Sequence, residues 1–206
     1  MLSASLIILS GGRSRRMQEN KAFIRVGGKR IIDIMMERFR AVFPEVLIIS
    51  NEPELYAEFG VPVYPDIYSC RVPLAGVHTG LVRANCEVAT VIACDMPFIS
   101  LELVEYMLNR RGNHQVVVPQ INGLLQPLAA VYHRSCINRL EKCLQNDWLK
   151  LVRVIETLDH TVVSAAELAL LGKVEELLMN VNDPDALIQA QFIWARHLSS
   201  CDIAAR

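Results

Sequence analysis

Three uninterrupted apolar runs constrain the fold of this chain more than any other feature. They are SLIIL (Ser5–Leu9), VLIIS (Val46–Ser50) and ATVIAC (Ala89–Cys94). A strand with one face in water alternates apolar and polar residues, whereas a strand buried on both faces of a parallel sheet is apolar throughout. The runs therefore predict three neighbouring, buried strands of a mostly parallel sheet.

Helical patterns separate these runs and follow them. Apolar residues recur at helical spacing in Arg30–Phe43, Pro73–Ala84, Leu101–Arg111 and His133–Leu144. Asp183-Pro184 is typical of an N-cap followed by a first-turn proline, and it predicts a C-terminal helix. Strands and helices in this order predict an α/β fold, with a doubly wound, mostly parallel sheet and helices on both faces.

Two further strands are predicted in the second half of the chain. VVVP (Val116–Pro119) and PLAAVY (Pro127–Tyr132) are apolar, and the turn signal Asn122-Gly123 between them favours an antiparallel arrangement. The sequence contains no internal repeat, low-complexity segment or linker. We therefore expect residues 1–206 to form one domain.

Composition limits the partners and the compartment. Lys and Arg number 21 against 22 Asp and Glu, so no global field favours nucleic acid or an anionic membrane. No apolar run approaches the roughly 20 residues of a membrane-spanning helix. The six cysteines lack CxxC spacing, which favours buried free thiols over disulfides or zinc. The apolar N-terminus lacks a basic region typical of a signal peptide, so a cytoplasmic location is expected.

The stretch LSGGRSRRMQENKAF follows the first predicted strand, which ends at Leu9-Ser10. Ligands of open α/β sheets bind beyond the carboxyl ends of the strands. Gly11-Gly12 would allow backbone N–H groups to approach an anion without interference from Cβ atoms. The cations able to neutralise phosphates follow in sequence: Arg13, Arg15, Arg16 and Lys21.

This combination predicts a site for a polyphosphate that carries a base and a sugar. The alternative is a solvated basic loop. GxxxxGK[ST] and GxGxxG motifs are both missing, so the chain is neither a P-loop NTPase nor an ordinary dehydrogenase.

Polar side chains follow other predicted strands at the same sheet edge. Asp95 is suited to be a ligand of magnesium, or alternatively the N-cap of the next helix. Asn180 and Asn182 offer further oxygen ligands, or simply stabilise a turn. Asp66 could accept paired N–H donors, and Asn51 can both donate and accept, although Asn51 also suits a helix N-cap.

Seven segments occur in the order of a known family and cover nearly the whole chain: LSGGRSRRMQENKAFIRVGGKRIID, VLIISNE, VYPD, VPLAG, CDMPF, QPLAAVY and NVNDPDAL. Together they closely resemble the nucleotidyltransferase family typified by molybdenum cofactor guanylyltransferase. The resemblance implies a fold of the nucleotide-diphospho-sugar-transferase type. It also implies Mg²⁺-dependent transfer of GMP from GTP to the terminal phosphate of molybdopterin, with release of pyrophosphate.

The resemblance also implies roles for individual residues. The nucleotide-binding set is Leu9, Ser10, Gly11, Gly12, Arg13, Lys21, Asn51, Asp66 and Asp95. Within the site, Lys21, Arg16 and Asp95 are the expected catalytic residues, and Asp95 is the metal ligand. Asn180 and Asn182 are candidates for the acceptor side or for a second set of metal contacts. Residues 1–100 would mainly bind the nucleotide, and residues 101–206 the acceptor.

Four positions depart from the family pattern: Ser10, Gln18, Asn20 and Asp183. Two other functions also stay open at this point. One is a nucleotidyltransferase that uses CTP, or a sugar or alcohol phosphate as acceptor. The other is a nucleotide-binding homologue without turnover, which Gln18 and Asn20 keep open. The resemblance also implies contacts with proteins of molybdenum cofactor synthesis or molybdoenzyme maturation.

Overall fold

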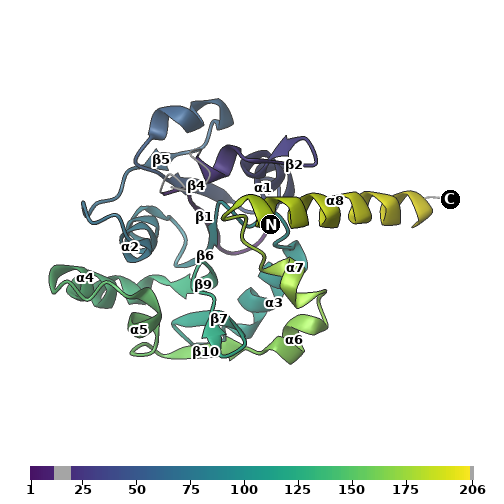
Figure 1. The fold of residues 1–206 in the computed structure, drawn as a ribbon. Helices are drawn as coiled ribbons and strands as arrows, with labels where there is room; N and C mark the ends of the chain where they lie inside the picture. Colours follow the sequence, from purple (N-terminus) through teal and green to yellow (C-terminus); the bar gives the residue numbers. More distant parts are fainter. Residues whose placement is uncertain (12–19, 205–206) are drawn as a thin grey trace.

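The computed structural model describes residues 1–11 and 20–204, with side chains up to residue 199. An eight-stranded sheet lies at the centre of the molecule (Figure 1). Its strands are ordered β10 (His160–Val163), β7 (Val116–Ile121), β9 (Ala129–His133), β6 (Val88–Ala93), β1 (Ser5–Leu9), β4 (Glu45–Ile49) and β5 (Val63–Tyr64), with β8 (Leu124–Leu125) paired to β7.

The three apolar runs form the middle of this sheet, as predicted. β1 pairs in parallel with β4 on one side and with β6 on the other. Leu9 at the end of β1 lies opposite both Ile49 and Ala93, so the three strands end level. Every residue of β1 is buried. The residues that follow these strands consequently meet at one edge of the sheet.

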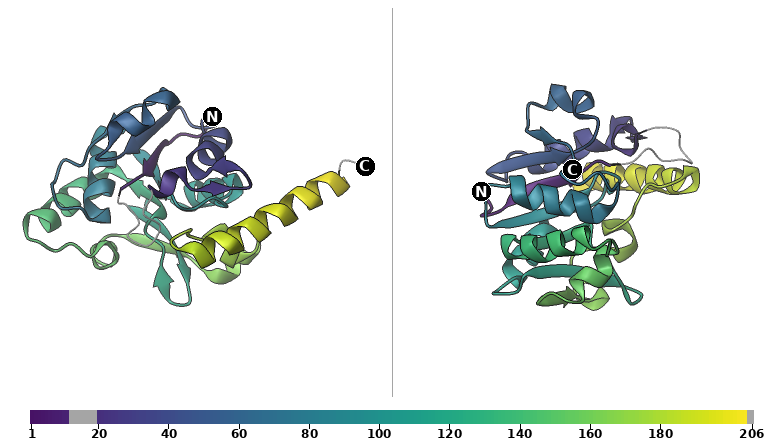
Figure 2. Two further views of the ribbon diagram at one scale, coloured as in Figure 1. Left: turned by 45° about the horizontal axis from the view of Figure 1, so that its top comes forward. Right: turned by 90° about the vertical axis from the view of Figure 1, so that its left-hand side faces the viewer.

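Helices cover both faces of the sheet, which confirms the predicted doubly wound fold (Figures 1 and 2). Leu6 and Ile8 point into a core shared with α1 (Ile31–Phe39), α3 (Leu101–Arg110) and α8 (Pro184–Ala204). Ile7 and Leu9 point to the opposite face, into a core shared with α2 (Pro73–Arg83), α4 (Ile137–Gln145) and α5 (Leu151–Ile155). Two short helices, α6 (Ala165–Ala169) and α7 (Val174–Leu177), follow β10.

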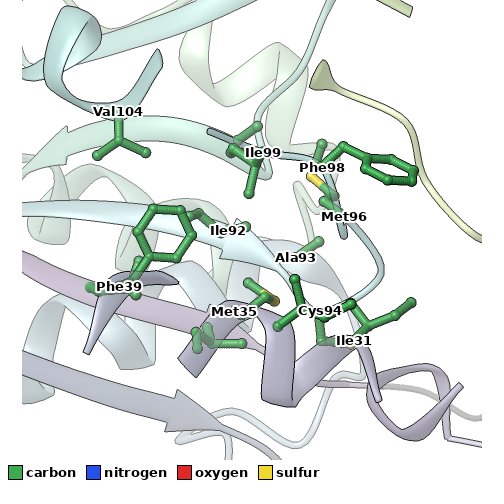
Figure 3. Close-up of a cluster of buried hydrophobic side chains, with 14 of the residues drawn as sticks. Ile31, Met35, Phe39, Ile92, Ala93, Cys94, Met96, Phe98, Ile99 and Val104 are labelled. Atoms are coloured by element: carbon green, nitrogen blue, oxygen red, sulfur yellow. The ribbon is translucent and has the colours of Figure 1, made fainter. Parts of the chain in front are cut away.

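The first core extends to the loop that follows β6. Met35 and Phe39 of α1 belong to the same buried cluster as Ile92 of β6 (Figure 3). Met96 and Phe98, which lie in the loop between β6 and α3, are also buried there. Apolar packing thus anchors the loop that carries Asp95.

The antiparallel part of the sheet differs from the prediction in one detail. β9 is antiparallel to β7, as expected, and also to β6. The Asn122-Gly123 turn is present, with φ angles of 50° and 77°. It joins β7 to the short strand β8, however, so PLAAVY is not the partner that the turn brings back. Two successive residues with positive φ form a two-residue hairpin turn. Such a turn pairs β7 with the segment that follows it immediately, which is β8.

Most predicted helices begin within a residue of their expected position, and their ends differ more. α1 ends at Phe39, four residues before Phe43, while the segment His133–Leu144 divides into a 3₁₀ turn, η3 (Arg134–Cys136), and α4. Asp183 caps α8 as expected, since its Oδ1 accepts a 2.9 Å hydrogen bond from the Ala186 amide. Among the described residues, none of the helices combines the length and apolar character needed to cross a bilayer. The five cysteines whose side chains are described carry free thiols: Cys70, Cys86, Cys94, Cys136 and Cys143.

Helix α8 connects two distant parts of the chain. It packs on the small hairpin of β2 (Arg25–Val26) and β3 (Lys29–Arg30). Gln191 accepts a 2.9 Å hydrogen bond from the Gly27 amide, and the Trp194 indole lies so close that a Cβ on Gly27 would be 1.9 Å from its Nε1. Glycine is therefore required at this position. Its positive φ of 59° also favours glycine, because other residues rarely adopt such an angle. The far end of α8 projects beyond the body (Figures 1 and 2).

Candidate active site

A cavity of about 790 Å³ opens at the carboxyl edge of the sheet. Its walls come from the ends of β1, β4 and β6, from the segment after β5, and from the first turn of α2. All seven described members of the expected nucleotide-binding set line it: Leu9, Ser10, Gly11, Lys21, Asn51, Asp66 and Asp95. Three other expected residues, Gly12, Arg13 and Arg16, lie outside the described part of the chain.

At one side of the cavity an ammonium group joins two oxygen-bearing side chains. Lys21 is the first residue of a 3₁₀ turn, η1 (Lys21–Phe23). Its Nζ donates to Asp95 Oδ2 at 2.9 Å and also to Asn182 Oδ1. The Asp95 side chain is only 10% exposed, so this ion pair is largely shielded from water. Residues 21, 95 and 182 are thus brought together from three distant segments.

The two asparagines of the NVN segment have different surroundings. Asn182 contacts Lys21, as described, whereas the Asn180 amide donates a long 3.5 Å hydrogen bond to the Leu178 carbonyl within its own turn. Between them, the Val181 amide donates a 2.8 Å bond to the Asp95 carbonyl. This backbone bond fixes the NVN segment to the loop after β6 and places Asn182 beside Asp95.

The loop that carries Asp95 does not use it as a helix cap. Ser100 caps α3, because its Oγ accepts a 3.2 Å bond from the Leu103 amide. The alternative role of Asp95 as an N-cap is therefore wrong. The loop is held instead by the partly buried guanidinium of Arg38, which donates to the carbonyls of Pro97 and Ile99. Burial lowers the pKa of Arg38.

At the other side of the cavity Asn51 and Asp66 bind each other. The Asn51 amide donates to Asp66 Oδ2 at 2.9 Å, and the Asp66 backbone amide donates to Asn51 Oδ1 at 3.1 Å. The 3₁₀ helix η2 (Pro53–Phe59) is preceded instead by Glu52, whose amide donates to Ser50 Oγ at 3.2 Å. Asn51 is thus not the predicted cap, and its side chain orients Asp66.

The Asp66 carboxylate is partly buried against the first turn of α2. Burial raises its pKa, and the hydrogen bond from Asn51 opposes that shift. Its Oδ1 is buried and has no hydrogen-bond partner among the described residues. A Cβ added to Gly76 would come 3.3 Å from Leu9 Cδ2 and 3.7 Å from this oxygen. Gly76 of the VPLAG segment therefore lies directly beside the carboxylate, close to the side chain of Leu9.

The described residues offer a limited metal site. No cluster of three or more His, Cys, Asp or Glu side chains suited to a metal occurs within residues 1–11 and 20–199. Asp95 Oδ1, however, is buried without a hydrogen-bond partner there, and the Asn182 oxygen lies at the same ammonium. A hard cation accepts such oxygen ligands and completes its shell with phosphate and water. The residues present therefore fit a divalent cation that arrives with a polyphosphate.

Sequence reasoning missed three residues of this region. Glu52 and Arg71 line the cavity, and Arg71 could have been suspected because it is a charge next to the VPLAG segment. Tyr56 is fully buried, and its hydroxyl bonds to Ser10 at the cavity wall. Nothing in the sequence marks Tyr56, because an aromatic residue in ELYAEF is typical of a core position.

The fold, the cavity and the sequence are those of one class of enzyme, the nucleotidyltransferases. Residues 6–162 match the family model described as the MobA-like NTP transferase domain. This span covers most of the chain, and the chain therefore belongs to the MobA-like NTP transferase family.

Relatives and solved structures agree with this assignment. A "Probable molybdenum cofactor guanylyltransferase" from Pelotomaculum thermopropionicum is 37% identical, over 93% of each chain. A "Molybdenum cofactor guanylyltransferase" from Desulfosudis oleivorans is 30% identical, over 90% of this chain and 93% of that one.

The fold matches the crystal structure of molybdopterin-guanine dinucleotide biosynthesis protein A from Archaeoglobus fulgidus, with a TM-score of 0.83, 22% identity and coverage of 93% and 99% of the two chains. It also matches 2-C-methyl-D-erythritol 4-phosphate cytidylyltransferase from Thermus thermophilus, with a TM-score of 0.69, 18% identity and coverage of 93% and 98%. At such identities the likeness shows a shared fold.

Proposed function

We propose that this protein transfers GMP from GTP to the terminal phosphate of a molybdopterin-type acceptor and releases pyrophosphate. The relatives at 30% and 37% identity support this activity through their names. One structural observation supports roles for individual residues. A single cavity holds the Lys21–Asp95 pair on one side and the Asn51–Asp66 pair on the other, as a triphosphate attached to a base would require.

On the phosphate side, the main obstacle to reaction is repulsion between two anions. The acceptor phosphate is already ionised near neutral pH, so its attack on the α-phosphorus needs no general base. Lys21 would neutralise and orient the α-phosphate, together with the cations at Arg13 and Arg16. The role of Lys21 requires it to exchange its bond to Asp95 for a bond to phosphate.

We infer that the divalent cation is Mg²⁺, held by Asp95 and Asn182 together with phosphate oxygens. The unpartnered Oδ1 of Asp95 supports this assignment. When bound, Mg²⁺ supplies positive charge that stabilises the pyrophosphate leaving group. Asn180 is left to the acceptor side.

On the base side, Asp66 would accept hydrogen bonds from N1–H and N2–H₂ of guanine, while Asn51 holds the carboxylate in place. The unpartnered Asp66 Oδ1 beside Gly76 supports this role. Cytosine presents a single amino donor and adenine presents an acceptor at N1, so both would leave a buried oxygen unpaired.

The experiment that tests the proposal is pyrophosphate release with GTP, CTP or ATP and molybdopterin as acceptor, each with Mg²⁺. We expect kcat/KM for GTP to exceed that for CTP at least about tenfold, since one unpaired buried group costs roughly 1–3 kcal/mol. Equal or better use of CTP would assign the chain to cytidylyl transfer. Release of no pyrophosphate with any donor would favour the binding homologue without turnover.

The proposal also includes a cytoplasmic location, as the sequence predicts. Contacts with proteins that supply the acceptor or receive the product are part of the same proposal. Co-purification with a molybdoenzyme chaperone, compared between cells with and without molybdate, would test this part.

A further inference from the structure

The Tyr56 side chain has one polar atom, its hydroxyl oxygen, and this atom connects two parts of the cavity wall. The residue lies in η2 and is 0% exposed. Its hydroxyl is hydrogen-bonded to Ser10 Oγ, and it accepts a 3.1 Å bond from the Asn20 amide. Ser10 directly follows β1, and Asn20 directly precedes Lys21. The hydroxyl therefore holds Ser10 and Asn20 at a fixed distance from each other.

Asn20 passes this constraint on to Lys21. Its Oδ1 accepts a 3.1 Å bond from the Ala22 amide, so Asn20 caps the 3₁₀ turn that Lys21 begins. If the Asn20 side chain turned away, the first residue of η1 would lose its fixed position. The Lys21 ammonium could then no longer be held against Asp95.

The aromatic ring and the hydroxyl of Tyr56 have separable roles. The ring packs on Phe23 and Phe59, with centroid distances of 5.3 Å and 6.4 Å. Phenylalanine would keep this packing and remove only the oxygen. Burial raises the pKa of Tyr56, so the hydroxyl stays neutral and keeps its proton for a hydrogen bond. We therefore treat the hydroxyl as a structural contact.

We propose that Tyr56 is a positioning residue for nucleotidyl transfer, which acts through Asn20 to hold Lys21 at the phosphate side of the cavity. The catalytic part of this inference rests on the proposed function. The positioning of Lys21 does not, because it can be measured without turnover. Tyr56 itself is not among the residues that line the cavity, so we expect it to act through its neighbours.

The test compares Tyr56→Phe with Tyr132→Phe. Tyr132 is also 0% exposed and donates a 2.7 Å bond to the Pro127 carbonyl, so its variant controls for the general loss of a buried hydroxyl. We expect kcat of Tyr56→Phe to fall about 10- to 100-fold, as for a displaced catalytic group, with a small change in KM. Tyr132→Phe should keep kcat. In a Lys21→Ala background, Tyr56→Phe should cause no further loss, because both changes remove the same contribution.

A second readout does not depend on activity. Lys21 is 24% exposed and bound to two partners, so acetic anhydride should modify it slowly in the wild type. In Tyr56→Phe the modification, read by mass spectrometry, should be several-fold faster, while Lys29 should react at an unchanged rate. Unchanged labelling of Lys21 would overturn the inference whatever the activity. Faster labelling in a protein whose wild type transfers no GMP would keep the inference and reject the proposed function.

If Tyr56→Phe does not fold, Asn20→Ala tests the same connection from the other end. It removes the contact to the Tyr56 hydroxyl and the cap of η1, and leaves the buried ring in place. The same faster labelling is expected. An Asn20→Ala protein with wild-type kcat and wild-type labelling would overturn the inference.

Discussion

Asp66 and Asp95 lie in the same cavity and differ mainly in their partner. Each uses Oδ2 to accept a 2.9 Å hydrogen bond, and each keeps a buried Oδ1 without a partner among the described residues. Asp66 is held by the neutral amide of Asn51, whereas Asp95 is held by the ammonium of Lys21. Under the proposed function, these two carboxylates bind different ligands.

The hydrogen-bond partner of each carboxylate thus influences which ligand the carboxylate suits. A neutral neighbour leaves the charge of Asp66 uncompensated, and that charge suits N–H donors of a base. A cationic neighbour balances Asp95 until another cation or a phosphate arrives.

Removal of either member of the charged pair should have the largest effect. Asp95→Asn and Lys21→Ala should each lower kcat/KM by about 10²- to 10³-fold, as for loss of a preorganised charge at the reacting phosphate. Lys29→Ala is the matched control, because Lys29 pairs with Glu37 on the surface. Steady-state pyrophosphate release measures all three. Normal turnover of Asp95→Asn across a magnesium titration would remove Asp95 from the metal site.

The same pair should set the affinity for a free metal ion. The Lys21 ammonium lies against the oxygens that would hold the cation, and two positive charges repel each other there. Lys21→Met should therefore bind Mn²⁺ without nucleotide at least about tenfold more tightly than the wild type. Electron paramagnetic resonance of free Mn²⁺ measures this, with Lys29→Met as control. Equal affinity would show that Lys21 and the metal do not share Asp95.

Loss of the Asn51–Asp66 pair should change selectivity more than rate. Asp66→Ala should remove most of the GTP preference, about tenfold, and spare the weaker CTP rate. Glu54→Ala, an exposed carboxylate in the neighbouring 3₁₀ helix, should leave the preference unchanged. Parallel kcat/KM values for both donors provide the measurement. An equal loss for all donors would mean that Asp66 supports the fold and does not contact the base.

The smallest expected effect is that of pH on Asp66. Because burial raises its folded pKa, protonation begins at a higher pH than in the unfolded chain. The GTP preference should therefore decrease as pH falls through the folded pKa, and Asp66→Asn should show no such decrease. The stability contribution of Asp66 is present at low pH and is lost as pH rises through the folded pKa. Asp66→Asn should accordingly unfold no more easily than the wild type at neutral pH. Greater destabilisation at pH 7 than at pH 4 would contradict the assigned burial.

The sequence predicted the sheet edge well, because the apolar runs themselves mark where the buried strands end. Asp95 and Asp66 could be placed at that edge, since each directly follows a strand. Their partners could not be assigned, because Asn51 has the local pattern of a helix cap and Asn182 differs from Asn180 only in its position within a turn. Tyr56 was missed because its function lies in one buried oxygen and its sequence context is apolar.

The close packing of Trp194 on Gly27 gives the protein an optical reporter. The chain has two tryptophans, and Trp148 is 40% exposed on the surface, so Trp148→Phe would leave one fluorophore at the junction of α8 and the β2–β3 hairpin. That hairpin follows η1, and α8 follows Asn182, so both sides of the junction continue directly from residues that contact each other at the cavity. Emission from the remaining indole would shift to longer wavelength if nucleotide binding moved the two sides apart, and stopped-flow mixing would time that movement against the release of pyrophosphate.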